Sequence, residues 1–286
     1  MNKYVIFISN PFGFGPSGKT VALMEELAIK WKKGKIVYIA SKLCQEILPE
    51  KLKKQIIIET ADERNEAILK NLLLKYPTPF VVCTLNKVAI KTAKSLGLRA
   101  IFVDSLSWMW KKIPEEYLLA DTYYCFDLFD IRNKIPKLDN IKIIPPVFGY
   151  LPKVNVHKKP YTLLHLGGFD NPYQHKIFET YLNLLIESLK NNLSKQLIVS
   201  GGGEAMQYMK KRLQNTKILF KTFGRNQFLH TLNNASHFIT TSGLTATLEA
   251  FALKTPVSFI PPTNLSQWRI LKLLISLVFL PKIPRI

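Results

Sequence analysis

Short runs of β-branched and aromatic residues alternate with longer amphipathic segments through almost the whole chain of 286 residues. Segments with apolar residues at helical spacing, such as 19–33, 62–76 and 84–96, separate many of these runs. Nearly continuous apolar strands separated by helices are typical of a parallel sheet covered on both faces. The pattern therefore predicts an α/β fold. In the first half the strands are expected at residues 4–9, 35–40, 55–59, 80–83, 99–103, 122–125 and 141–144.

A proline-rich stretch over residues 145–160 interrupts this alternation and is typical of a linker. A second series of strands and helices follows it. Its strands are expected at residues 161–166, 196–200, 217–219, 237–240 and 256–260, and its helices at 172–189, 204–213, 225–234, 244–253 and 265–274. We predict two Rossmann-like domains, 1–148 and 161–286, joined by a linker at 149–160 and facing across a cleft. Ligands of open α/β sheets bind at the carboxyl ends of the strands.

The charge balance permits an anionic partner but does not identify one. Lys and Arg number 40 and Asp and Glu 20, which gives a net charge of +20. Because the lysines are scattered, we expect no specific nucleic-acid binding, although a basic surface also permits peripheral contact with an anionic membrane. The three cysteines form no CxxC pair, which argues against a disulfide framework and a structural zinc site. The unpaired cysteines fit a reducing cytoplasm, where we expect the protein. No apolar run reaches the ~20 residues that span a bilayer, which predicts a soluble or at most peripheral protein.

The first expected strand runs into a glycine-rich turn that reads GFGPSGKT at residues 13–20. This string satisfies the P-loop pattern, in which backbone N–H groups and a lysine, here Lys19, hold nucleotide phosphates. Asp104 would then be the carboxylate near magnesium. Pro16 argues against this hypothesis, because proline removes an N–H group from the cradle. Two other interpretations stay open, a turn without a ligand and a turn that faces a substrate in the cleft.

Three glycine-rich turns follow strands of the second half, at residues 167–168, 201–203 and 242–243. Each allows the backbone to approach a diphosphate, with a helix N-terminus behind it. The segment 240–262, TTSGLTATLEAFALKTPVSFIPP, then places Glu249 about two helical turns after the Ser-Gly turn. A carboxylate there can accept hydrogen bonds from a ribose diol; the alternative is a solvated glutamate on a helix. Residues 222–225 either flank a base or form a capped helix start.

The segments SGLTATLEA, PVSFIPP and LSQW, within residues 242–268, resemble the donor-nucleotide segment of GT-B glycosyltransferases. They are similar to those of the N-acetylglucosaminyltransferase that completes lipid II in peptidoglycan synthesis. The GFGP turn and the string VDSLSWMW at 103–110 resemble the cytosylglucuronate synthase group, which implies UDP-glucuronate as donor and a cytosine-type base as acceptor. The resemblance implies an enzyme that moves a sugar from a UDP-linked donor to a small-molecule acceptor, without a bound metal or cofactor.

The resemblance also implies roles for individual residues. The Ser-Gly turn contacts the diphosphate, Glu249 binds the ribose and Gln267 contacts the donor sugar. The acceptor is expected against Phe14, Gly15, Pro16, Ser17 and Trp108, with Trp110 nearby. The full set of expected donor-binding residues is Gly167, Gly168, Gly202, Arg225, Ser242, Gly243, Thr245, Glu249 and Gln267.

An inverting transfer needs a general base on the acceptor side. We expect Asp104 in this role, because it ends a strand; the alternative is an aspartate that caps the next turn. His165, beside the turn at 167–168, is a rival on the donor side. The second domain is shorter than the resemblance implies. A truncated homologue that binds a nucleotide-sugar without catalysis therefore stays open as an alternative to an active transferase. The string at 13–20 leaves a second alternative, a P-loop kinase or NTPase.

Overall fold

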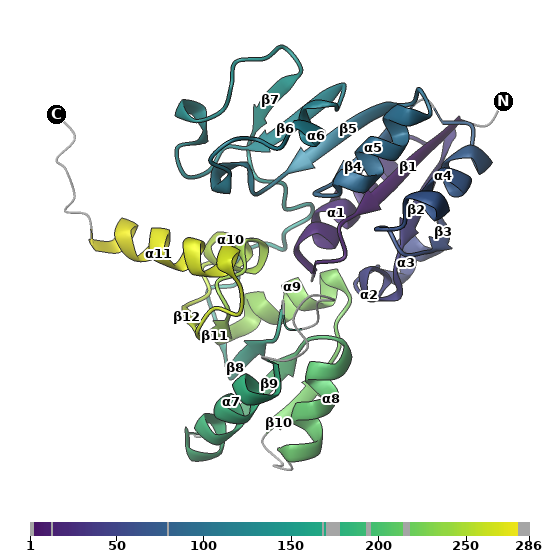
Figure 1. Cartoon of the computed structure of the whole chain (residues 1–286). Helices are drawn as coiled ribbons and strands as arrows, with labels where there is room; N and C mark the ends of the chain where they lie inside the picture. Colours follow the sequence, from purple (N-terminus) through teal and green to yellow (C-terminus); the bar gives the residue numbers. More distant parts are fainter. Residues whose placement is uncertain are drawn as a thin grey trace.

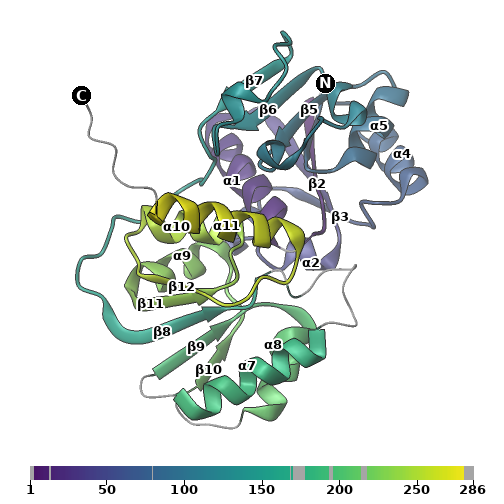
Figure 2. The same cartoon turned by 60° about the vertical axis from the view of Figure 1, so that its left-hand side comes forward.

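The computed structural model describes residues 3–12, 14–78, 80–167, 169, 178–192, 196–213 and 218–279. Within these residues the chain forms two separate parallel sheets, one of seven strands and one of five. Figure 1 shows the first sheet with its helices above the second, and Figure 2 shows α10 and α11 lying between them. The predicted α/β class with two Rossmann-like units is confirmed.

The first sheet has the strand order β3-β2-β1-β4-β5-β6-β7, and every neighbouring pair is parallel. All seven expected runs form strands, with bounds that shift by one or two residues. The strands are β1 Lys3–Ser9, β2 Gly34–Ala40, β3 Ile57–Thr60, β4 Phe80–Thr84, β5 Arg99–Asp104, β6 Thr122–Phe126 and β7 Ile141–Ile144. The strand order reverses between β1 and β4, which is the position where open α/β sheets bind ligands.

Helices cover both faces of this sheet because alternate strand residues point to opposite sides. Val5 and Phe7 of β1 pack with α1, α2 and α3, whereas Ile6 and Ile8 pack with α4, α5 and α6. Asn65 and Asn86 cap α4 and α5 by accepting hydrogen bonds from backbone N–H groups. The helices are α1 Phe14–Lys30, α2 Lys42–Gln45, α3 Glu50–Lys53, α4 Glu66–Lys75, α5 Lys87–Ser95 and α6 Glu115–Leu118, with short 3₁₀ turns at Ser107–Met109 and Ile131–Asn133.

Helix α1 begins five residues earlier than the predicted start at residue 19. Pro16 lies in its first turn, where a backbone N–H has no intrahelical partner, so its ring costs no hydrogen bond. The sequence pattern missed this start because glycine and proline were interpreted as turn residues.

The second sheet has the order β10-β9-β8-β11-β12 and is also parallel throughout. Its helices α7 and α8 pack on one face, and α9 and α10 on the other. The predicted helix at 172–189 is described from Phe178 onward. The elements are β8 Lys159–His165, α7 Phe178–Asn192, β9 Gln196–Ser200, α8 Gly203–Arg212, β10 Ile218–Lys221, α9 Arg225–Asn234, β11 Ala235–Thr240, α10 Leu244–Ala252, β12 Val257–Phe259 and α11 Leu265–Phe279.

A small apolar cluster joins the two halves. Trp108 and Ile131 of the first half pack with Leu244 and Ile270 of the second, and all four side chains are buried. The Arg269 side chain adds a hydrogen bond from Nη1 to the Met109 carbonyl at 2.8 Å. Helix α11 is thus held against the first half. In the described part of the chain, no helix has both the length and the apolar character required to cross a membrane.

We predict that Trp108→Ala lowers the free energy of unfolding by about 3–5 kcal/mol, because the substitution leaves a cavity in this cluster. Urea denaturation followed by circular dichroism measures the change. Trp268→Ala is the matched control, since Trp268 is 50% exposed whereas Trp108 is 6% exposed. Equal losses in the two variants would contradict the assignment of Trp108 to the contact between the halves.

Candidate functional site

A cavity of ≈ 260 Å³ lies between the two halves, at the carboxyl ends of strands from both sheets. Residues after β1, β4 and β5 form one wall, and residues after β8, β9 and β11 form the other. Both strand-order reversals, β1 to β4 and β8 to β11, border this cavity. The topology thus brings to one place loops that are more than 200 residues apart in the sequence.

Most of the expected donor-binding residues lie on the second-half wall. Those that line the cavity are Gly167, Arg225, Gly243, Thr245, Glu249 and Gln267. Ser242 is fully buried behind this wall, where its Oγ donates a hydrogen bond to the Gln267 carbonyl at 2.7 Å. Ser242 therefore ties the glycine turn to α11. Gly168 lies outside the described residues.

Gly202 is placed where the halves touch rather than on the cavity surface. A Cβ at this position would overlap the Glu46 carboxylate and would lie 2.8 Å from Cζ of Phe14. Glycine is therefore needed for the close approach of α8 to the first half. The neighbouring Gly201 lines the cavity instead.

Three helices of the second half begin without a side-chain cap, and two of them begin at the cavity. The N-cap residues of α8, α9 and α10 are Gly202, Gly224 and Gly243, and none of them makes a side-chain cap hydrogen bond within the described residues. Arg225 at the start of α9 and Gly243 and Leu244 at the start of α10 line the cavity, whereas at α8 only the preceding Gly201 does. Because the first N–H groups of a helix have no internal partner and carry partial positive charge, the starts of α9 and α10 favour an anion in the cavity.

A buried ion pair lies on the same wall. Arg225 donates from Nη1 to Oε1 of Glu249 at 2.6 Å, and the side chains are 6% and 2% exposed. The Arg225 guanidinium also donates to the Phe148 carbonyl, and its backbone N–H donates to the Ile47 carbonyl. Burial raises the pKa of Glu249, and the adjacent Arg225 opposes that shift. The prediction of a solvated glutamate is wrong, since the carboxylate is buried between the two halves.

Lys19 reaches across the cavity from α1 in the first half. Its Nζ donates to Thr245 Oγ1 at 2.6 Å and to the Gly15 carbonyl at 3.1 Å. Burial lowers the pKa of Lys19 to about 8, although Glu249 opposes the shift. The transferase interpretation had assigned Lys19 no role; its only signal was the GKT string.

The P-loop hypothesis is wrong. Residues 14–20 are helical and do not form a loop that wraps a phosphate. The Thr20 hydroxyl, which would have to reach a metal ion, is fully buried and bonds Thr84 Oγ1 at 2.8 Å. Asp104 is also buried and turned toward aromatic side chains, so the proposed magnesium carboxylate is not available there.

The first-half wall is mainly aromatic and aliphatic. Phe14, Gly15 and Pro16 line the cavity as expected, and Trp110 does too. Ser17 and Trp108, which were also expected against the acceptor, lie behind the cavity surface. Ser17 faces Ser9, and the Trp108 indole donates to the Ser105 carbonyl. The sequence missed Phe12, Leu85, Leu106 and Tyr117, which also line the cavity.

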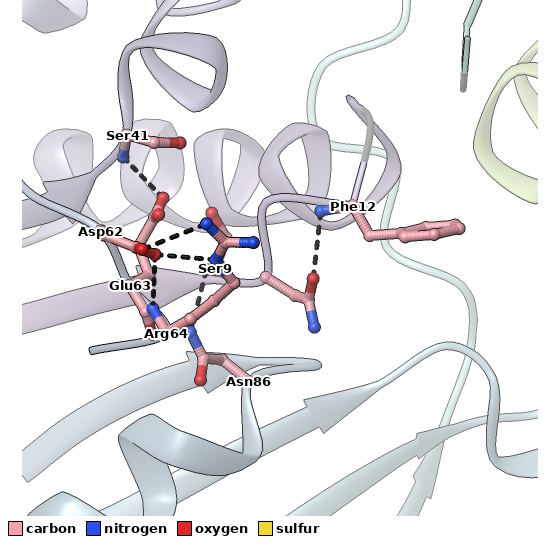
Figure 3. Close-up of polar contacts among 8 residues, drawn as sticks. Ser9, Phe12, Ser41, Asp62, Glu63, Arg64 and Asn86 are labelled. Atoms are coloured by element: carbon pink, nitrogen blue, oxygen red, sulfur yellow. Dashed lines mark hydrogen bonds and ion pairs between the residues drawn. The ribbon is translucent and has the colours of Figure 1, made fainter. Parts of the chain in front are cut away.

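Polar contacts hold the β1–α1 turn in place below this wall. The Asn86 side chain donates to the carbonyls of Ser9 and Glu63, and Glu63 accepts from the Ser41 N–H at 2.6 Å. Figure 3 shows the Phe12 ring directed away from this network, while the Phe12 N–H donates to Asn10 Oδ1 at 3.0 Å. The turn thus presents Phe12 on its outer side.

Asp104 lies behind the aromatic wall and is fully buried. Its Oδ2 accepts from Tyr123 at 2.6 Å and from the Trp110 indole at 3.0 Å, and its Oδ1 accepts from the Leu106 N–H at 2.6 Å. Burial raises the pKa of Asp104. The capping alternative fits this geometry, and a role as base stays a prediction that requires the 104–110 loop to open.

His165 and Glu46 also line the cavity. Burial lowers the pKa of His165 to about 4, so its imidazole is neutral at neutral pH, and its ring lies 4.7 Å from that of Phe228. Glu46 lies on the first-half side, and burial raises its pKa. Among the described residues, the carboxylates that line the cavity are those of Glu249 and Glu46. Glu249 is paired with Arg225, whereas Glu46 forms no ion pair in this part of the chain.

Solved structures share this architecture at low sequence identity. The S. aureus MnaA protein, solved with UDP, is 14% identical, with 98% of this chain and 88% of that chain covered and a TM-score of 0.60. UDP-GlcNAc 2-epimerase from Neisseria meningitidis, bound to UDP-GlcNAc, is 12% identical, with 94% and 85% covered and a TM-score of 0.64. The spinosyn forosaminyltransferase SpnP is 12% identical, with 96% and 84% covered and a TM-score of 0.58.

These comparisons define the class of fold. The chain has the GT-B fold, with two Rossmann-like domains that face each other across a cleft. No protein-family model and no curated protein sequence matches it.

We predict that Glu249→Ala lowers the free energy of unfolding by about 3–5 kcal/mol, because it leaves the Arg225 charge buried without its partner. Glu187→Ala is the control. Glu187 pairs with Lys190 on the surface of α7, where the side chains are 65% and 49% exposed. Chemical denaturation that showed the same small change for both variants would contradict a buried, desolvated pair.

Proposed function

We propose that this protein is a glycosyltransferase that moves a sugar from a UDP-linked donor to a small-molecule acceptor. The observation that carries the proposal is the convergence of two uncapped helix starts, those of α9 and α10, with Lys19 and Arg225 on one cavity. Diphosphate is the anion whose two linked charges fit several such groups. The neighbours solved with UDP and UDP-GlcNAc support uridine as the nucleoside.

In this proposal the donor is held by residues of the second-half wall together with Lys19 of the first half. Gly243, Thr245 and Lys19 hold the diphosphate, and Glu249, oriented by Arg225, accepts hydrogen bonds from the ribose. Gln267 accepts from the Thr263 N–H and hydroxyl through Oε1, at 2.8 and 2.9 Å. Its amide NH₂ group is then the end that faces the donor sugar.

The reaction needs charge stabilisation more than covalent chemistry. The acceptor oxygen or nitrogen attacks the anomeric carbon, and the bond from that carbon to the diphosphate oxygen breaks. The electron pair leaves with UDP, where N–H groups, Lys19 and Arg225 stabilise it. We propose that these groups make a bound metal unnecessary. Glu46 is the carboxylate placed to take the acceptor proton, because it lines the first-half wall.

The narrower resemblance to the cytosylglucuronate synthase group selects the first substrates to test. UDP-glucuronate is the first donor, and cytosine is the acceptor that this resemblance implies. Binding of UDP without release of UDP from any UDP-sugar would instead favour a non-catalytic homologue.

We predict that UDP raises the melting temperature in a thermal-shift assay, also in the presence of EDTA, and that ATP with magnesium does not. Lys19→Met is expected to weaken UDP binding by about 1–3 kcal/mol, because it removes a charge-assisted hydrogen bond to the diphosphate. Lys30→Met is the control on the same helix, since the Lys30 side chain is 76% exposed. Stabilisation by ATP with magnesium alone would overturn the proposal.

UDP affinity should also depend on pH. The phosphates of UDP are already ionised above pH 7, since their second pKa is about 6. Lys19, with a pKa of about 8, loses its charge as the pH rises to 9.5, and UDP affinity should fall over this range. Calorimetry at pH 7, 8 and 9.5 measures the fall. Lys19→Met should show weak binding without this dependence, and an equal fall in that variant would assign the titration to another group.

A further inference from the structure

We infer that the first-half wall of the cavity is a subsite for a planar, ring-bearing acceptor with few hydrogen-bonding groups, such as a phenol. The inference rests on the proposed transfer from a UDP-sugar and specifies its acceptor. It excludes free sugars and other polyhydroxylated acceptors as the preferred substrates.

The wall is built from large carbon-rich side chains of separate loops. Phe12 follows β1, Leu85 follows β4, and Leu106, Trp110 and Tyr117 follow β5. The rings of Trp110 and Tyr117 pack with centroids 5.9 Å apart at an interplanar angle of 60°. Aromatic side chains in such arrangements offer faces and edges that complement a further flat ring.

The Asn10 and Trp110 polar groups of this wall are engaged inside the protein, whereas Glu46 forms no ion pair with any described residue there. The Asn10 amide donates to the Leu85 carbonyl at 2.9 Å, while its carbonyl oxygen accepts from the Phe12 N–H. The Trp110 indole N–H donates to Asp104. A sugar placed here would lose its hydration and find few partners for its hydroxyls besides the Glu46 carboxylate, which is unfavourable. A flat apolar ring has few hydrogen bonds to water, so its transfer to this wall would cost little hydration free energy.

Leu85 shows that the apolar character of the wall is maintained at a cost. Its φ angle is 54°, in the left-handed region that residues other than glycine, asparagine and aspartate rarely adopt. Hydrogen bonds hold it there, from its N–H to the Val103 carbonyl and from Asn10 to its own carbonyl. Glycine would relieve the strain, yet the chain places a leucine side chain at the cavity. Strain of this kind at a cavity points to a role in function.

Asp104 gains a role in this arrangement as a positioning residue. By accepting from the Trp110 indole and from Tyr123, it fixes the orientation of the Trp110 ring against the cavity. For a phenol, the acceptor oxygen would attack the anomeric carbon and pass its proton to Glu46, while the electron pair of the broken bond leaves with UDP.

Isothermal titration calorimetry with saturating UDP tests the inference with three probes: 4-methylumbelliferone, methyl β-D-glucopyranoside and cytosine. We expect 4-methylumbelliferone to bind at least tenfold more tightly than either of the others. Glucoside or cytosine binding as tightly as 4-methylumbelliferone, or no binding of 4-methylumbelliferone, would overturn the inference. If UDP itself does not bind, the proposed function fails, and this outcome is distinct from the previous ones.

Two variants locate the binding on this wall. Leu85→Gly suits the positive φ angle and removes the side chain from the cavity. Because Leu85 also packs in the core of the first half, circular dichroism and UDP binding check that the variant is folded. We expect it and Trp110→Ala to weaken 4-methylumbelliferone at least fivefold while UDP binding stays unchanged. Trp268→Ala, on the exposed side of α11, is the control. Unchanged 4-methylumbelliferone affinity in Leu85→Gly would show that the ring binds elsewhere and would overturn the inference.

Discussion

The N–H groups at the start of a helix must find a partner, and the second half of this protein leaves three such starts without a side-chain cap in its described residues. The capped helices α4 and α5 of the first half show the contrast, since Asn65 and Asn86 satisfy theirs. The parallel topology then directs all three uncapped starts toward one edge of the sheet. Lys19 and the Arg225–Glu249 pair complete a region where an anion is favoured.

The fold was largely predictable from the sequence because parallel strands are buried on both faces. Such strands are short, apolar runs bounded by helices. The strands at 35–40 and 99–103 can therefore be predicted from their own residues, without knowing which strands lie beside them. The start of α1 was not predictable in the same way. Gly15 and Pro16 have low helix propensity, and only the first-turn position explains why they are tolerated.

The site was predictable where its residues are close in sequence. Gly243, Thr245 and Glu249 lie within one turn and the helix after it, so their spacing alone places them together. Lys19 was missed as a partner of Thr245 because 226 positions separate them, and only the closure of the two halves brings them to 2.6 Å. Leu85 was missed for another reason. Its φ angle is positive, and its carbonyl accepts a hydrogen bond from the Asn10 side chain, which lies 75 positions away in the sequence.

The glycine at position 202 has a consequence for motion. An added Cβ there would overlap the ends of the Glu46 and Phe14 side chains, so the start of α8 and these two side chains lie in close contact across the two halves. A bulkier residue at position 202 requires either that both side chains move or that the halves separate, and separation would part Lys19 from Thr245. A variant with separated halves would distinguish the ligand binding that the second half provides alone from the binding that requires both halves.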